Sequence, residues 1–486
     1  MSTLNRIYVR FVFTFLFYRT TISFVKFQKN AFLNPFVDNL TGTVSVSYLH
    51  FLIIIVYFYQ YSIGEYMMKT LAIIAEYNPF HNGHFYQLHK AKEITGANRA
   101  IAVMSGNFLQ RGIPAMWDKY LRANMAVLAG IDMVLELPFV YATGSAYDFA
   151  MGAIHMLNKL ESIDYLCFGA ETDDLAGMLS VARIFVEEPE EYKQALQTEL
   201  ANGKSYPCAR EEALYSYLNS HKSNTIISDN LKDILSLPNN TLALEYLCAL
   251  IRANSKIIPV LIKREQSNYH DDALQQTYSS ANAIRQKLLE GNDALLCEKQ
   301  LPATSLSLIN KANGVTAPIV SSHLSELLQG VRINHLRADD ICDFDKDLAD
   351  RFSKLPLQLS YEEVQAMLQT KNKTASRIAR ALIHYLLNYK QKDRIEFQNN
   401  GYIYYACLLA FNKNASSLIK QINTNGKIKI ITKKADYLLH FDNALLPTAT
   451  SMWEFDMKAT ELYNTLVYNR FKTTLPNDYQ QTPIIV

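Results

Sequence analysis

The stretch "TLAIIAEYNPFHNGH", Thr70 to His84, joins an apolar run to a turn that holds two histidines around an Asn-Gly pair. The run over 70–75 is typical of a buried strand, and the following pattern predicts a helix over 84–95. Ligands of open α/β sheets bind outside the carboxyl ends of the strands. We therefore expect the loop from Glu76 to His84 to line a ligand crevice.

Strands and helices alternate after this stretch. We expect further strands at 99–104, 132–137, 163–168 and 256–263, and helices at 84–95, 118–129, 146–160, 239–254 and within 278–291. This order predicts parallel βαβ units and therefore an α/β fold with a doubly wound parallel sheet. Pro259 inside the last strand predicts an edge or bulged position.

The βαβ rhythm fades after Pro302, where the strongest pattern is a helix over 374–389. A short alternating run at 427–431 suggests some strand near the end. We expect a domain boundary near residue 300. It would separate an α/β domain at 68–300 from a mainly helical C-terminal domain at 301–486.

The first 67 residues differ from the rest, because they are rich in Phe, Tyr, Val and Ile. Their two apolar stretches, 11–18 and 48–59, are each shorter than the roughly 20 residues that cross a bilayer. We interpret 1–67 as an over-extended gene start, with Met67 or Met68 as the true first residue. The rival interpretation is a membrane anchor.

Composition limits the function classes. The formal net charge is only +2, so nucleic-acid affinity would have to come from local basic patches. The six cysteines form no CxxC pair, which argues against a zinc ribbon or a disulfide scaffold and fits a reducing cytoplasm. We therefore expect a cytoplasmic protein with no membrane-embedded part.

The histidines of the turn suit an anion. The start of a helix offers free N–H groups and a favourable dipole. His81 and His84 can aim donors at one site, Pro79 stiffens the loop, and Gly83 leaves room for a phosphate near the backbone. Such donors stabilise charge that develops when a bond at an α-phosphorus breaks. The alternatives are a simple turn and a zinc site, but HxxH needs two further ligands and none lies nearby, so we expect no metal site.

Longer motifs carry a resemblance. "HNGH" matches the HxGH signature of the HUP nucleotidyltransferase superfamily. The segments "IIAEYNPFHNGHFYQL", "AVMSGNFLQRGIPA", "DKYLRANMAVLAGIDMVLELPF", "FGAE", "LPNNTLALEY" and "KREQSNYHD" follow in order. Together they closely resemble the bacterial tRNA(Met) cytidine acetate ligase family, from about Met68 to near the C-terminus.

The resemblance implies a doubly wound, Rossmann-like nucleotidyltransferase domain and an ATP-dependent ligase. The family activates acetate as acetyl-adenylate, releasing pyrophosphate, and uses no acetyl-CoA. The acetyl group then passes to the wobble cytidine of elongator tRNA(Met), forming N4-acetylcytidine. The expected cofactors and partners are ATP, Mg²⁺, acetate and tRNA(Met), and a homodimer is a further expectation.

The resemblance also implies site residues. His81 and His84 are the expected catalytic residues. The expected ATP-binding residues are Ile74, Ala75, Glu76, Tyr77, Asn78, Pro79, Phe80, His81, Asn82, Gly83, His84, Phe85, Tyr86, Gln87, Gly169, Asn239 and Arg264. Asn239 is preferred to Asn240 because it follows the proline directly. Ser280 and Arg285 are candidate phosphate contacts in "SSANAIRQ", where Asn282 replaces the hydroxyl residue of many related enzymes.

The sequence leaves open the roles of two sets of charged residues. Gln110, Arg111, Asp118, Lys119 and Arg122 follow the second strand and are expected to line either the acetate pocket or the tRNA approach. A basic stretch predicts tRNA contacts at Lys373, Arg377 and Arg380, with His384 and Tyr385 available to stack on bases. For both groups the plain alternative is a solvated charged surface.

Two other functions compete with the ligase. A small-molecule adenylyltransferase that makes a nucleotide cofactor would share the HxGH chemistry, but it needs no helical C-terminal half. A non-catalytic RNA-binding protein with a relic nucleotide fold is the other alternative. The intact His81, Gly83 and His84 argue against that last class.

Overall fold

The computed structural model describes residues 68–220, 234–235, 237–264, 279–291, 294–310, 317–334 and 337–486. The predicted extension at 1–67, including the start at Met67, lies outside the described residues. Residues Lys69–Val486 form one compact unit, which is described below.

The centre of this unit is an eight-stranded sheet in the order β5-β4-β1-β2-β3-β6-β7, with β8 paired to β6. The first five strands are parallel, whereas β6 runs antiparallel to β3. The strands are β1 Thr70–Ala75, β2 Arg99–Ser105, β3 Met133–Leu137, β4 Tyr165–Ala170, β5 Ile258–Lys263, β6 Ala406–Phe411, β7 Ile430–Ile431 and β8 Ile484–Ile485. The doubly wound order is confirmed, and Pro259 lies in an edge strand as predicted.

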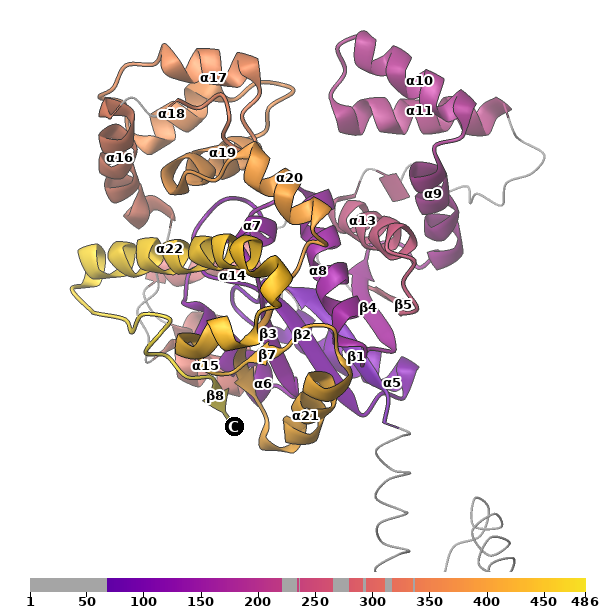
Figure 1. Cartoon of the computed structure of the whole chain (residues 1–486), viewed down its shortest axis with the longest axis vertical. Coiled ribbons are helices and arrows are strands. Elements are labelled where there is room, and N and C mark those ends of the chain that lie inside the picture. Colours follow the sequence, from indigo (N-terminus) through magenta and orange to yellow (C-terminus); the bar gives the residue numbers. More distant parts are fainter. Residues whose placement is uncertain are drawn as a thin grey trace, which may run out of the picture. The chain divides into compact units, whose positions relative to one another are not determined.

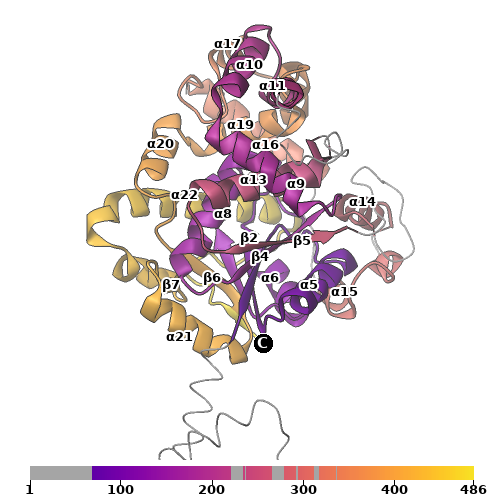
Figure 2. The ribbon, with the colours of Figure 1, turned by 90° about the vertical axis from the view of Figure 1, so that its right-hand side faces the viewer.

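Helices cover both faces of the sheet (Figures 1 and 2). Those of the first half are α5 Asn82–Thr95, α6 Lys119–Leu128, α7 Phe139–Ala142, α8 Ala146–Leu160, α9 Leu175–Glu187, α10 Glu190–Ala201, α11 Tyr206–Ser220 and α13 Pro238–Arg252. Later helices are α14 Ala281–Gly291, α15 Ala303–Ile309, α16 Ala317–Ile333, α17 Lys346–Ser353, α18 Tyr361–Leu368, α19 Ala375–Leu387, α20 Gln391–Asn399, α21 Ser416–Asn425 and α22 Leu446–Phe471. Short 3₁₀ turns are η2 Ala294–Cys297, η3 Lys413–Ala415, η4 Lys434–His440 and η5 Asn443–Leu445.

The alternation of side chains along β1 explains the two layers. Leu71 and Ile73 point to a core shared with α5, α6, α14 and α15. Ala72, between them, points to the opposite core, which α8, α9, α13 and α22 also build. A strand whose residues are apolar at successive positions is buried on both faces, as in parallel sheets with helices on each side.

The C-terminal region adds to the same sheet. β6 pairs with β3 and carries β7 and β8 on its far side. The remainder of this region, from α15 to α22, is mainly helical. The division at residue 300 stays a prediction, but the chain beyond it contributes three strands to the sheet that holds the first five.

The strand order fixes the place of a ligand crevice. β1 has β2 on one side and β4 on the other, so the chain changes winding direction between β1 and β4. Crevices of doubly wound folds open at the carboxyl ends of such a pair. The loops after Ala75 and Ala170 therefore meet at this point.

Candidate active site

Two histidines form the turn between β1 and α5. His81 is the residue that caps α5, and its Nδ1 accepts a hydrogen bond from the Gly83 N–H at 3.0 Å. His84 reaches back, and its Nδ1 accepts the His81 N–H at 3.3 Å. The two rings stack with centroids 3.8 Å apart. This reciprocal capping box holds both imidazoles at the helix N-terminus.

Both imidazoles are neutral, and their hydrogen bonds determine which ring nitrogen carries the proton. Burial, with smaller effects from the Arg264 and Arg285 cations, lowers the pKa of His81 to about 3. Burial, followed by His81 and Arg264, lowers the pKa of His84 well below its usual range. Since each Nδ1 accepts an N–H, each proton must lie on Nε2. The pair therefore presents two Nε2–H donors.

Gly83 has a packing reason of its own. A Cβ added there would lie 2.9 Å from Cε1 of His81, closer than side chains tolerate. The glycine therefore lets the His81 ring fold back onto the first turn of α5. The expectation that it makes room for a phosphate stays a prediction.

A cavity of about 260 Å³ opens beside the histidines. Its lining joins loops from four strands with the starts of α13 and α14. Among the predicted residues, the lining includes Ile74, Ala75, Glu76, Tyr77, Asn78, His81, His84, Gln87, Gly169, Asn239, Arg264, Ser280 and Arg285. Gly83 and Tyr86 line a smaller adjoining cavity of about 40 Å³.

Four predicted residues line neither cavity. Pro79 precedes Phe80, which is fully buried against the Tyr77 ring. The Asn82 side chain donates to the Lys299 carbonyl, and Phe85 is among the exposed apolar residues. These residues shape or anchor the turn.

Gly169 and Arg264 meet across the β4–β5 pair. Gly169 is in register with Ile262, and a Cβ added to Gly169 would lie 3.4 Å from Cγ of Arg264. The arginine side chain is partly open to solvent, and the protein atoms packed around its guanidinium lower its pKa. Among the residues that the structure describes, no carboxylate lies within ion-pair distance of its guanidinium. A guanidinium that lines a cavity without a carboxylate partner favours an anionic ligand.

Glu171 holds the start of α13. Its Oε2 accepts the Asn240 N–H at 2.9 Å, and its Oε1 accepts the Asn239 N–H at 3.3 Å and the Asn239 side-chain amide at 2.5 Å. Asn240 is fully buried and its Oδ1 accepts the Glu171 N–H. Only Asn239 of the two lines the cavity, so the preference for Asn239 agrees with the geometry.

Helix α14 brings a second cation. Arg285 donates from Nη1 to the Asn78 carbonyl at 2.7 Å and from Nη2 to Oδ1 of Asn282 at 3.3 Å. Burial lowers the Arg285 pKa to about 10. Ser280 caps α14 through its Oγ, which accepts the Ala283 N–H at 3.0 Å. Asn282 thus orients the arginine from the position where a hydroxyl residue was expected.

The charged group that follows β2 divides into two parts. Gln110 and Arg111 line the cavity, as the acetate-pocket interpretation requires. Asp118 instead caps α6, accepting the N–H groups of Tyr120 and Leu121. Lys119 and Arg122 are fully buried, so the expectation that they line a pocket is wrong.

Arg122 is a buried arginine that holds the loops of the site together through hydrogen bonds. It donates to the carbonyls of Trp117, Glu76, Ser105 and Gly106. These carbonyls belong to the ends of β1 and β2 and to the loop that follows β2. The guanidinium therefore fixes the spacing of the two loops that face the cavity.

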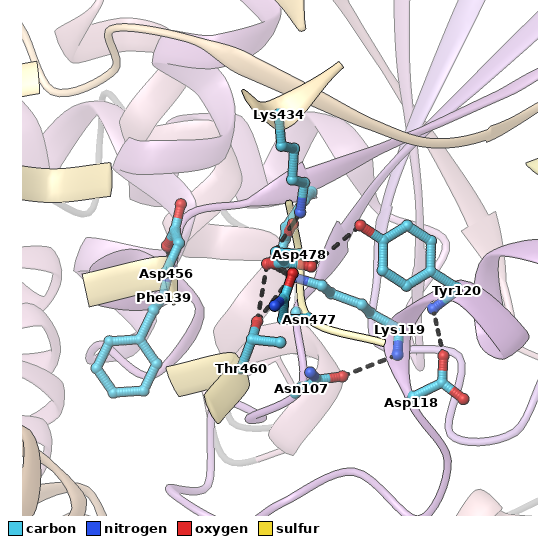
Figure 3. Close-up of polar contacts among 12 residues, drawn as sticks. Asn107, Asp118, Lys119, Tyr120, Phe139, Lys434, Asp456, Thr460, Asn477 and Asp478 are labelled. Carbon is cyan, nitrogen blue, oxygen red and sulfur yellow. Dashed lines mark hydrogen bonds and ion pairs between the residues drawn. The ribbon is translucent and has the colours of Figure 1, made fainter. Parts of the chain in front are cut away.

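Lys119 belongs to a buried charge network (Figure 3). Its Nζ lies 2.6 Å from Oε1 of Glu136, 2.7 Å from Oδ2 of Asp478 and 3.0 Å from Oγ1 of Thr460. Lys434 reaches the same two carboxylates, at 3.1 and 3.0 Å. We call Lys119, Glu136, Lys434 and Asp478 the buried network.

The basic residues of α19 and of the turn before it already form ion pairs. Arg377 contacts Asp345 at 2.9 Å, Arg380 contacts Asp343 at 3.2 Å, and Lys373 contacts Asp347 at 2.7 Å. His384 and Tyr385 are buried, so the expectation that they stack on bases is wrong. Arg377, Arg380 and Lys373 as tRNA contacts stay a prediction.

The apolar residues of the cavity that were not predicted include Phe149, Phe168, Leu242 and Tyr246. Phe168 directly precedes Gly169 on β4, so its position near the cavity could have been inferred from that predicted residue. Leu242 and Tyr246 on α13 belong to the quoted segment "LPNNTLALEY", which was the signal that could have indicated them, whereas Phe149 reaches the cavity through the packing of α8.

Within the described part of the chain, no group of three or more His, Cys, Asp or Glu side chains is arranged to hold a metal ion. None of the helices described there combines the length and apolar character that a membrane crossing requires.

Known proteins share this arrangement. A family model described as HIGH Nucleotidyl Transferase matches residues 68–478. The tRNA(Met) cytidine acetate ligase of Thermoanaerobacter sp. (strain X514) is 38% identical over 404 residues, which cover 82% of this chain and 96% of the relative. The protein of the same name from Acetivibrio thermocellus is 36% identical, over 82% of this chain and 94% of the relative.

Solved structures agree. The crystal structure of apo Thermotoga maritima TmcAL superimposes with a TM-score of 0.78 and 29% identity, over 86% of this chain and all of that one. A second crystal form of that protein, bound with alpha-thio ATP, gives a TM-score of 0.77. The chain therefore belongs to the HIGH nucleotidyltransferase family and, within it, to the tRNA(Met) cytidine acetate ligases.

Proposed function

We propose that this protein activates acetate with ATP and transfers the acetyl group to the wobble cytidine of elongator tRNA(Met), forming N4-acetylcytidine, AMP and pyrophosphate. One observation carries the proposal. Two neutral imidazoles with Nε2–H donors and two arginines, Arg264 and Arg285, gather at the ligand crevice of a doubly wound sheet. The related T. maritima protein binds an ATP analogue on the same fold.

Formation of the acetyl-adenylate requires only these hydrogen-bond donors and cations. An acetate oxygen attacks the α-phosphorus, and the bond to the β-phosphate bridging oxygen breaks. Negative charge grows on the departing pyrophosphate and on the α-phosphate oxygens. Fixed N–H donors from His81 and His84 stabilise that charge without reorganising. Arg264 and Arg285 offset the negative charge of the triphosphate. Without these cations, moving the phosphates from water into the cavity would be unfavourable.

Mg²⁺ is expected to arrive with the triphosphate. This ion keeps several waters and is commonly held by substrate phosphates together with one or two carboxylates. We propose that the nucleotide supplies most of the ligands, that the enzyme acts in the cytoplasm, and that a homodimer is its assembly.

The direct test measures both half-reactions with purified protein. Pyrophosphate exchange into ATP should depend on acetate, and unmodified tRNA(Met) should gain one acetyl group by mass spectrometry. Exchange that depends on a mononucleotide in place of acetate would contradict the ligase and support a cofactor-forming adenylyltransferase. Bulk tRNA from cells that lack the gene should have lost N4-acetylcytidine.

The tRNA is proposed to approach over α19. An added Cβ at Gly112, which has a positive φ of 73°, would overlap the backbone of Ala379 and Arg380. The loop that supplies Gln110 and Arg111 to the cavity therefore packs directly on α19. RNA phosphates near the cavity would compete with Asp343 and Asp345 for the arginines of this helix.

A pair of opposite changes tests this approach. Arg377→Ala with Arg380→Ala should raise the tRNA concentration at half-maximal rate by about tenfold, since phosphate contacts of this kind supply much of the affinity. Asp345→Asn should lower it, because asparagine keeps the cap of α17 and frees the cations. Acetate-dependent exchange is the control. Loss of exchange in the double arginine variant would remove α19 as an RNA surface.

A further inference from the structure

The second step of the proposed reaction needs a proton acceptor. The exocyclic N4 of cytidine carries two protons, and it must lose one when it forms the amide. The adenylate step has no such need, because acetate already attacks as an anion. A group that acts only as a base should therefore affect the second step far more than the first.

Most groups at the cavity cannot take this proton. The Nδ1 atoms of His81 and His84 accept backbone N–H groups, and their Nε2 atoms carry the protons. Burial raises the pKa values of Tyr77 and Tyr246 above the usual range of a phenol, so both stay protonated. The arginines are cations with no lone pair to offer.

Glu171 is close but engaged. Its influence raises the pKa of Arg264, which places its charge near the cavity. Both of its oxygens, however, accept N–H groups of α13, and the carboxylate is absent from the cavity lining among the residues described. It therefore acts as a cap for that helix.

Glu76 differs from Glu171 both in its place at the cavity and in the hydrogen bonds of its two oxygens. It is the first residue after β1, it is partly exposed, and it lines the cavity together with both histidines. Its Oε1 accepts the Gln110 N–H at 2.9 Å. For Oε2 the described part of the chain provides no hydrogen-bond partner. One oxygen is thus held by the loop after β2, and the other is left for a ligand.

The charge of Glu76 acts on cavity residues from two different helices. The carboxylate raises the pKa of Arg285, on one side, and of Tyr246, on the other. A carboxylate beside the expected triphosphate opposes nucleotide binding by like charge. Its presence in such a site is therefore better explained by a task that requires negative charge.

We propose that Glu76 is the general base for acetyl transfer. N4 of the cytidine attacks the carbonyl carbon of acetyl-adenylate while Oε2 of Glu76 takes one N4 proton. The new C–N bond forms as the bond from the carbonyl carbon to the AMP phosphate oxygen breaks, and its electron pair leaves with AMP. Glu76 then releases the proton to solvent. This inference rests on the proposed ligase function.

The matched test is Glu76→Gln. Glutamine keeps an oxygen that can accept the Gln110 N–H, but it cannot take a proton. In single-turnover experiments with enzyme-bound acetyl-adenylate, transfer to tRNA should slow by about 10²–10⁴-fold, the usual contribution of a general base. Acetate-dependent pyrophosphate exchange should fall far less, so the ratio of the two rates should drop at least about 100-fold. Glu76→Ala, which also frees the loop, should slow both steps.

Three outcomes overturn the inference. Transfer by the Glu76→Gln variant at the wild-type rate removes Glu76 as the base. An equal loss of both steps, corrected by raising Mg²⁺, assigns Glu76 to the metal instead. An equal loss that Mg²⁺ does not correct assigns it to positioning. A wild-type protein that shows no acetate-dependent exchange would instead refute the proposed function itself.

Discussion

The cavity and the buried network both place cations beside the carboxyl ends of neighbouring strands, but they treat those cations differently. In the buried network, Lys119 and Lys434 share Glu136 and Asp478, so two positive charges meet two negative ones. In the cavity, Arg264 is exposed and Arg285 is partly exposed, and no carboxylate within the described residues forms an ion pair with either guanidinium.

The difference separates a structural site from a binding site. Burial of an unpaired charge costs free energy unless a partner arrives. The buried network has its partners within the chain, and the Asp478 pKa lies below its usual range because the two lysines offset the burial of its carboxyl. The two cavity arginines lack such a partner among the described residues, so a polyphosphate in the cavity would supply the opposite charge.

Removing one charge from the buried network should give the largest effect. Asp478→Asn leaves two buried lysines with a single carboxylate, so we expect the free energy of unfolding to fall by about 3–5 kcal/mol. Urea denaturation measures the change. The control is Lys458→Met, which breaks an exposed pair with Glu454 and should cost less than about 1 kcal/mol. Equal midpoints for the two variants would contradict the network's role.

Removing a hydrogen-bond donor from the cavity should lower the rate of adenylate formation. His84→Ala should slow acetate-dependent pyrophosphate exchange by about 10²–10³-fold, because one fixed donor to the developing charge is lost. The loss of the bond from the His81 N–H to His84 should also cost roughly 0.5–2 kcal/mol of stability. The folded fraction must therefore be checked by circular dichroism. Unchanged exchange in the folded variant would remove His84 from the mechanism.

Removing an unpaired cation should separate binding from stability. Arg264→Met should raise the ATP concentration at half-maximal exchange by roughly 10–100-fold, since a hydrogen bond to a charged group contributes about 1.5–3 kcal/mol. The same change should leave the unliganded protein at least as stable, because no carboxylate loses a partner. Arg210→Met, which breaks the half-buried pair with Glu245, is the contrasting variant and should destabilise the protein. A destabilised Arg264→Met protein would mean that its charge is compensated within the fold.

The sequence predicted what depends on neighbouring residues. The turn at 76–84, the strand at 70–75 and the helix at 146–160 were all predicted, because apolar periodicity and capping are local. Neighbouring strands then brought Gly169 and Arg264 to His81 without any further assumption, since parallel strands share one carboxyl edge.

The sequence could not predict contacts between distant segments. The sequence places Lys119 among the pocket candidates because its partners Thr460 and Asp478 lie more than 300 positions away and only Glu136 is nearer. His384 looked exposed within a basic stretch, yet tertiary packing buries it beside Thr143. The apolar run "YYACLLAF" at 404–411 was the missed signal for β6.

The place of Asp478 in the chain has a consequence for biosynthesis. Proteins emerge from the ribosome N-terminus first. Lys119 and Lys434 are therefore made long before the carboxylate that completes their neutralisation, eight positions from the final valine. A premature stop or a protease cut just ahead of residue 478 would leave every residue of the cavity present, but on a scaffold with surplus internal charge. Cellular quality control would then be expected to clear such shortened chains before they encounter a transfer RNA.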